Sequence, residues 1–158
     1  MLIRSAFCLL LGTFSWDCNP DTDKEPFTRP DVPVDTVNGY FEVEVAPEEG
    51  TDWPPWGKGP TTLAADVRPG PDPAPTDDPW ILARLPVEPP YTLEVRAPVR
   101  EADGRTAPPP AATSLDDDGR HWQLDGLDLS APGVWSIEVE LRSDGGLVDT
   151  VELRFEVE

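Results

Sequence analysis

Apolar and polar residues alternate strictly along the last part of the chain. In residues 135–141 and again in 151–157, every second residue is apolar and those between are mostly charged. Residues 143–146 read Ser-Asp-Gly-Gly, and glycine tolerates the positive φ of a tight turn. This period of two predicts an antiparallel hairpin with one buried face. The predicted inward residues are Trp135, Ile137, Val139, Leu141, Val151, Leu153, Phe155 and Val157.

Five segments upstream also have the character of strands. Most alternate as the hairpin does, whereas 80–87 is largely apolar and is broken by Pro86, which suggests an edge strand or a bend. No segment of ten or more residues has the helical period of 3.6. The five segments are 39–50, 61–70, 80–87, 91–99 and 120–130.

Short strands separated by Pro- and Gly-rich turns predict the fold of residues 39–158. We expect an all-β, immunoglobulin-like antiparallel β-sandwich of about seven strands. The run Leu127–Glu140 resembles the corner before the penultimate strand of such sandwiches, where an aromatic residue braces the loop. Here Trp135 stands in the usual place of a tyrosine, so its indole N–H needs an acceptor of its own.

The first 18 residues have the form of an export signal. Arg4 precedes an apolar run from Ala6 to Phe14 that is too short to span a bilayer alone, and Cys18 follows. This leader resembles a bacterial lipoprotein signal, although Asp17 stands where that family has a small residue. The resemblance implies acylation at Cys18 and an anchor in the membrane; a secreted or an uncleaved form are the alternatives. Residues 19–38, rich in Pro and Asp, are expected to form a disordered tether.

The charge and the cysteine content of the chain exclude some classes of binding partner and metal site. The chain has 12 basic and 31 acidic residues and a net charge of -19, so it repels nucleic-acid backbones and suits cations or basic partners. The two cysteines, Cys8 and Cys18, both lie in the leader. Residues 39–158 therefore have no disulfide and no cysteine-based metal site.

The C-terminal part resembles the YtkA-like domains of exported bacterial proteins. The matching pieces are a polar turn, a Gly-x-aromatic corner and the final hairpin, carried by Asp118-Gly119, Trp122, Gly126-Leu127, Gly133 and Trp135. The resemblance implies the fold and an exported location. Some of that family are associated with copper or with respiratory-complex assembly through Met and His ligands. This chain has one Met and one His, so no copper function is carried over.

Three features are candidates for chemistry. Trp53 and Trp56 flank a Pro-Pro pair, and if exposed they could form a platform for a sugar ring or a proline-rich peptide. His121 is expected to be a solvent-facing strand residue. The aspartates 116–118 are expected to form an acidic hairpin loop instead of a calcium site. Apart from these three features, "TAPPPAAT" (residues 106–113) is expected to form a polyproline-like surface loop.

These features favour a non-enzymatic function. We expect an exported module, held at the cell envelope by a lipid on Cys18 and acting as an accessory or binding protein for an unknown protein or glycan. The alternative is a carbohydrate- or peptide-binding module that uses Trp53 and Trp56. No catalytic residue, metal ligand or cofactor is predicted, and nucleic acid is not an expected partner.

Overall fold

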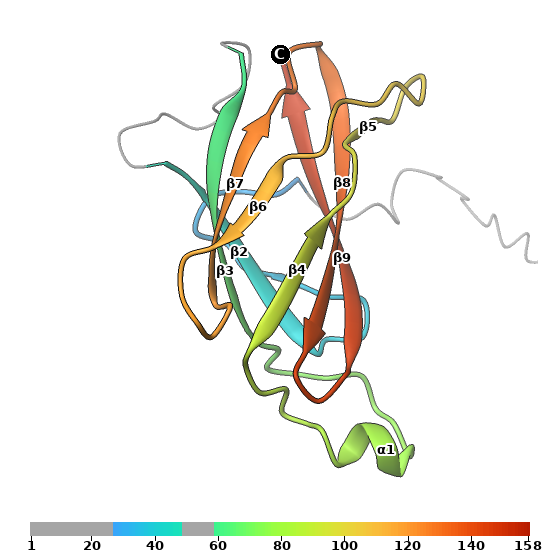
Figure 1. Cartoon of the computed structure of the whole chain (residues 1–158). Coiled ribbons are helices and arrows are strands. Elements are labelled where there is room, and N and C mark those ends of the chain that lie inside the picture. Colours follow the sequence, from blue (N-terminus) through green and yellow to red (C-terminus); the bar gives the residue numbers. More distant parts are fainter. Residues whose placement is uncertain (1–26, 49–58) are drawn as a thin grey trace, which may run out of the picture.

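The computed structural model describes residues 27–48 and 59–158. Nearly all the regular structure in them is β (Figure 1). In chain order the elements are β1 (Val34–Asp35), β2 (Phe41–Pro47), β3 (Thr61–Pro69), α1 (Pro79–Leu82), β4 (Tyr91–Val95), β5 (Val99–Arg100), β6 (Ala111–Ser114), β7 (His121–Leu127), β8 (Gly133–Ser143) and β9 (Val148–Val157). No helix in this part of the chain has the length and apolar character needed to cross a membrane.

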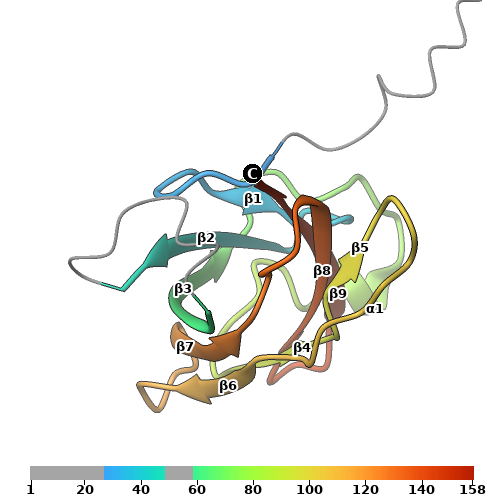
Figure 2. The same cartoon turned by 90° about the horizontal axis from the view of Figure 1, so that it is seen from above.

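The strands form two antiparallel sheets that face each other. One sheet has the order β1-β2-β3-β7-β6. In the other, β8 pairs with β9 on one side and with β4 and then β5 on the other. Figure 2 shows the two sheets on opposite sides of the molecule. The orders β2-β3-β7-β6 and β4-β8-β9 are those of the seven strands of constant-type immunoglobulin domains. The predicted immunoglobulin-like sandwich is therefore confirmed.

The alternation of apolar residues places one face of each strand in the core. Every residue predicted to point inward from the closing hairpin is buried, and the ladder pairs Trp135 with Phe155 and Val139 with Val151. The alternating apolar residues of β2 and β3 are buried as well: Phe41, Val43, Val45, Leu63, Ala65 and Val67. At the first residues of β2 and β4, the rings of Phe41 and Tyr91 pack edge to face, with centroids 5.5 Å apart. Burial of these apolar side chains is the main force that holds the sheets together.

Trp135 forms the predicted corner at the start of β8. Its side chain is buried, and its indole N–H donates to the carbonyl oxygen of Ala131, 2.9 Å away. A tyrosine at this corner of other sandwiches bonds in the same sense, back to the chain a few residues upstream. The indole thus finds the acceptor that its burial requires.

The structure corrects the sequence analysis in two segments. Residues 80–87, expected as a strand, begin instead within the short helix α1 and continue as loop. Asp78 caps this helix by accepting the N–H of Trp80 at 2.8 Å, and Pro79 occupies its first turn. The other segment is "TAPPPAAT", expected as a surface loop, whose last residues belong to β6 and pair with β7.

Residues 27–38, which the sequence pattern assigned to the tether, lie along the sandwich. The N–H of Thr28 donates to the carbonyl of Arg154, and the N–H of Val37 to that of Thr150, both at 2.8 Å. Between these points the segment crosses to the other sheet, where β1 pairs with β2. This part of the chain therefore joins the edges of the two sheets.

A buried carboxylate fixes the turn that follows. Asp149 on β9 is 3 % exposed, and it accepts the hydroxyl of Thr36 at 2.6 Å. It also accepts the backbone N–H groups of Asn38 at 3.0 Å, Tyr40 at 3.3 Å and Thr150 at 2.9 Å. A buried charge is stable when donors surround it in this way. Asp149 thereby ties the entry to β2 to the opposite sheet.

Candidate functional site

The predicted binding and lipidation residues lie outside the described part of the chain. Cys18 belongs to residues 1–26, and Trp53 and Trp56 belong to residues 49–58. Both assignments therefore stay predictions.

Three connections meet at the end of the sandwich where β9 begins. They are the α1 loop (residues 70–90, between β3 and β4), the β6–β7 connection (residues 115–120) and the β8–β9 turn (residues 144–147). In immunoglobulin terms they are the B–C, D–E and F–G loops, and B–C and F–G supply binding residues in variable domains. The α1 loop is longer than most connections in compact domains. Loops of that length with little regular structure are uncommon, and they are usually either functional or linker segments.

The α1 loop is held in place at several points. Val87 is buried in the core, and the hydroxyl of Tyr91 donates to its carbonyl at 3.2 Å. The guanidinium of Arg84 joins the loop to the β8–β9 turn, because its Nε donates to the carbonyl of Gly145 at 2.8 Å. Its Nη1 donates to the carbonyl of Trp80, also at 2.8 Å, and its Cζ lies 4.1 Å from the centroid of the Trp80 ring. Arg84 thus orients the indole and braces the loop at the same time.

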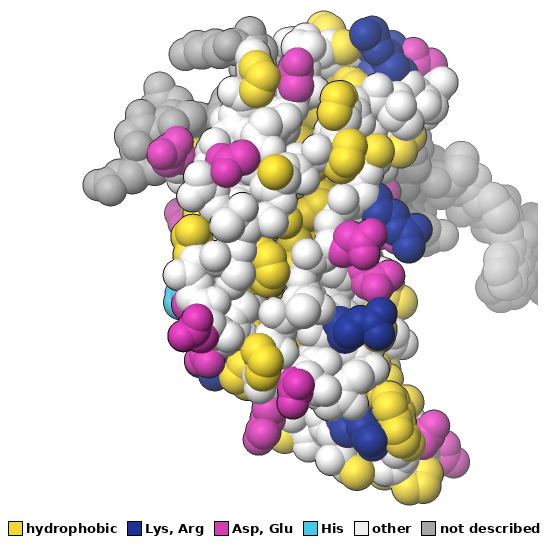
Figure 3. Space-filling model, in the orientation of Figure 1, with side chains coloured by type: hydrophobic (Ala, Val, Ile, Leu, Met, Phe, Trp, Pro, Cys, Tyr) yellow, Lys and Arg dark blue, Asp and Glu magenta, His cyan; other side chains and the backbone are white. Residues whose placement is uncertain are grey.

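The braced loop presents apolar side chains to solvent. Trp80 is 48 % exposed and Leu82 is 53 % exposed, and both belong to α1. Figure 3 shows hydrophobic side chains gathered at this end of the molecule, with basic and acidic side chains beside them. Tryptophan is usually largely covered in a folded protein, and it is enriched where proteins bind one another. This patch of Trp80 and Leu82 is the apolar part of the candidate site.

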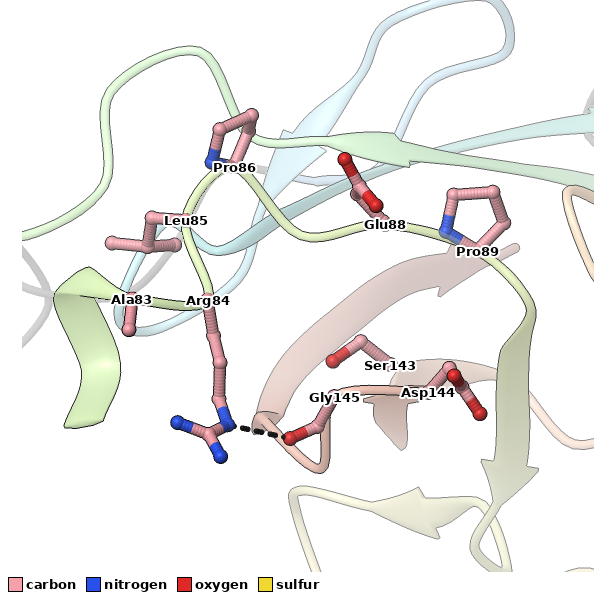
Figure 4. A pocket seen from close by; sticks show the side chains of 9 residues that line it. All are labelled: Ala83, Arg84, Leu85, Pro86, Glu88, Pro89, Ser143, Asp144 and Gly145. Carbon is pink, nitrogen blue, oxygen red and sulfur yellow. Dashed lines mark hydrogen bonds between the residues drawn. The ribbon is translucent and has the colours of Figure 1, made fainter.

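A cavity of about 320 Å³ separates the α1 loop from the β8–β9 turn (Figure 4). One wall consists of residues 83–86, Glu88 and Pro89, and the other consists of residues 143–145. The Arg84 guanidinium is turned toward Gly145, while Glu88 and Asp144 lie on the two walls. The cavity is therefore mixed in character, with proline rings and carboxylates around one opening.

Sequence reasoning missed this site because three neighbouring apolar residues, Trp80 to Leu82, imitate a buried strand. The signal that could have revealed it is Asp78 followed by Pro79, since an N-cap residue before proline is typical of a helix start. The link to Gly145 has no local signal at all, because that residue lies 61 positions away.

His121 lies on the outer face of the β1-β2-β3-β7-β6 sheet, as predicted. Its side chain is 59 % exposed, its Nδ1 is 2.6 Å from a carboxylate oxygen of Asp116, and its Nε2 is 3.8 Å from Asp66. The hydrogen bond to Asp116 raises the pKa of His121 above its ordinary 6.5, and it lowers the pKa of Asp116. Within the described residues, no serine hydroxyl is hydrogen-bonded to this histidine.

The acidic connection before His121 is a closed turn. One oxygen of Asp116 accepts the backbone N–H of Arg120 at 2.9 Å while the other meets the histidine. Trp122 donates its indole N–H to the carbonyl of Gly119 at 2.7 Å. Across residues 27–48 and 59–158, no three His, Cys, Asp or Glu side chains come together as a metal site would need.

The fold and the candidate site define the chain as an immunoglobulin-like β-sandwich with a braced, apolar loop at one end. No family model matches the chain, and no curated protein matches it. Among solved structures, it is similar to the crystal structure of a DUF4426 family protein from Pseudomonas aeruginosa PAO1. The identity is 9%, the TM-score is 0.49, and the match covers 80% of this chain and 96% of that chain.

Proposed function

We propose that this chain is a non-enzymatic, exported β-sandwich module that is anchored through Cys18 and binds a partner protein through the α1 loop. The observation that carries the proposal is Trp80, an exposed indole fixed by Arg84 on a loop that is itself anchored in the core. Holding an interface side chain in place before binding lowers the entropy lost on association. A braced tryptophan is therefore suited to recognition.

The distance between the N-terminal end of the sandwich and the α1 loop supports the same proposal. The described residues begin at Phe27, and the N–H of the next residue bonds to Arg154. Arg154 lies six residues along β9 from Val148, which is roughly 20 Å of extended strand, and the α1 loop lies beyond the Val148 end (Figure 1). A lipid on Cys18 would thus attach the sandwich to the membrane near Arg154 of β9. The α1 loop, beyond the Val148 end of the same strand, would then point away from the membrane.

The leader and the C-terminal motif supply the exported location in this proposal. The leader resembles a lipoprotein signal that ends at Cys18, and the pieces from Asp118 to Trp135 resemble a YtkA-like domain. Residues 19–26 could span at most roughly 30 Å, so the sandwich would stay close to the membrane surface. That arrangement suits an accessory protein of the envelope.

Two measurements test the proposal. Mass spectrometry of the mature N-terminus should find a diacylated or triacylated Cys18, and a chain that still begins at Met1 would contradict the anchor. For the binding role, a photo-crosslinking residue is placed at Leu82 and, as a matched control, at Glu94 on β4. We expect a discrete crosslinked product in the producing cells from position 82 alone. It should be lost when Trp80→Ala is added, and its persistence would refute binding through the indole.

A further inference from the structure

Two carboxylates stand on opposite walls of the cavity beside α1. Glu88 comes from the α1 loop and Asp144 from the β8–β9 turn; both line the cavity, and Figure 4 shows their carboxyl groups turned outward, away from each other. Neither forms an ion pair with another described residue. Arg84, the one basic residue of the walls, already donates to Gly145 and to the carbonyl of Trp80. The two carboxylates are therefore available for a cation from outside.

The size of the cavity indicates what could enter it. Its volume of about 320 Å³ equals roughly ten water molecules and lies at the lower limit of pockets that hold drug-sized ligands. It thus suits one long side chain with a few waters. The apolar part of its lining, Leu85, Pro86 and Pro89, offers a surface for an aliphatic stem. A lysine or arginine side chain has such a stem and ends in a positive charge.

The charge around the cavity favours the same occupant. The loops at this end carry many more carboxylates than guanidinium groups, and the whole chain has a net charge of -19. Such a field attracts cations and raises the rate at which a basic partner associates. The acidic residues of these loops are Asp72, Asp77, Asp78, Glu88, Asp116, Asp117, Asp118 and Asp144, and the basic ones are Arg84 and Arg120.

We infer that this cavity receives a lysine or arginine side chain of the partner protein, whose charge meets Glu88 or Asp144 at the rim. The inference rests on the proposed binding role of the α1 loop and adds the chemistry of the partner to it. Trp80 and Leu82 lie on the same loop as Glu88, so the complementary segment carries an apolar residue near its basic one. The apolar contact then provides affinity, and the charge provides selection and register.

The test uses the full mature chain in detergent micelles and a tetralysine peptide as the probe. At low salt, we expect tetralysine to shift the amide resonances of Ser143, Asp144 and Gly145 saturably, and tetraglutamate to leave them unchanged. Glu88→Gln and Asp144→Asn should each weaken binding about three- to fivefold, as expected for an exposed charge contact at low salt. Each should leave the fold intact, because both residues are exposed.

The matched control is Glu156→Gln, which removes one charge at the far end of β9 from an exposed residue. It should weaken binding less than about twofold, since screening limits its reach. Equal loss from Glu156→Gln and Asp144→Asn, or the absence of saturable shifts at the β8–β9 turn, would overturn the inference. If the crosslink at Leu82 depends on Trp80 but not on Glu88 or Asp144, the inference fails while the proposed function stands.

Discussion

Replacing Asp149 with alanine tests how much of the stability comes from one buried carboxylate. The side chain accepts the Thr36 hydroxyl at 2.6 Å and the Tyr40 N–H at 3.3 Å, and both of these residues are buried. It also accepts the Asn38 amide Nδ2 at 2.9 Å, but Asn38 is exposed and can turn to water. Truncation therefore leaves two donors without ready access to water.

The magnitude follows from these orphaned groups. A buried donor that loses its partner costs about 1–3 kcal/mol. The Thr36 hydroxyl still has the Phe41 carbonyl at 3.0 Å, which reduces its share. Removing a buried charge also relieves its own desolvation. We therefore expect Asp149→Ala to lower the free energy of unfolding by about 2–4 kcal/mol. Asp149→Asn should recover less than half of that, because either amide orientation sets an NH₂ group against backbone N–H donors.

The assay is urea unfolding followed by tryptophan fluorescence, with the midpoint and the slope fitted to two states. Glu152→Ala is the control, because it removes an exposed carboxylate from the same strand and should change stability by no more than about 0.5 kcal/mol. A loss below about 1 kcal/mol for Asp149→Ala, at an unchanged slope, would refute the reasoning. It would mean that water or a rearranged turn satisfies the donors at little cost.

Three further predictions concern the turns and the corner. The imidazole of His121 should titrate above pH 6.5 by NMR, and Asp116→Asn should return the midpoint toward 6.5. Because the pKa of His121 is raised in the folded state, the stability that this residue contributes is present below pH 6.5. It is lost as the pH rises through the folded-state pKa. Trp135→Phe should lower the free energy of unfolding by about 1–3 kcal/mol in urea, since it removes a buried hydrogen bond and part of the ring, and an unchanged midpoint would contradict the corner. Gly119→Ala should lower it by more than about 2 kcal/mol, because φ is +64° and a Cβ would lie 2.0 Å from the carbonyl oxygen of the first residue of β4. Gly146→Ala, with φ of +84° and open space around it, should lower it by only about 1–2 kcal/mol, and equal losses from the two would show that the close approach does not matter.

The sequence determined the fold class because burying one face of a strand imposes the same alternation on every strand of the sandwich. A strand with one buried face must alternate, so the inward residues of β2, β3, β8 and β9 could be identified one strand at a time. The need of Trp135 for an acceptor was also visible, since a buried indole N–H must be satisfied. In these segments the local preference and the tertiary environment agree.

Local pattern failed where contacts between distant segments decide the structure. The prolines before β6 favour a loop, yet Ala111–Ser114 pair with β7 because the edge of that sheet is open to them. The apolar residues of α1 could fill a strand, but Asp78 and Pro79 start a helix whose loop is then held by Arg84. Strand propensity depends on neighbours that a single segment does not contain.

The candidate site was decided by the tertiary structure alone. Its cavity joins Glu88 on one loop to Asp144 on another, and its brace joins Arg84 to Gly145 across 61 residues of sequence. The tie from Asp149 to Thr36 spans 113 residues. Alternation records which face of a strand is buried, because burial acts on each residue separately. The alternation does not indicate which loops lie next to each other, since that depends on how the two sheets are connected and stacked.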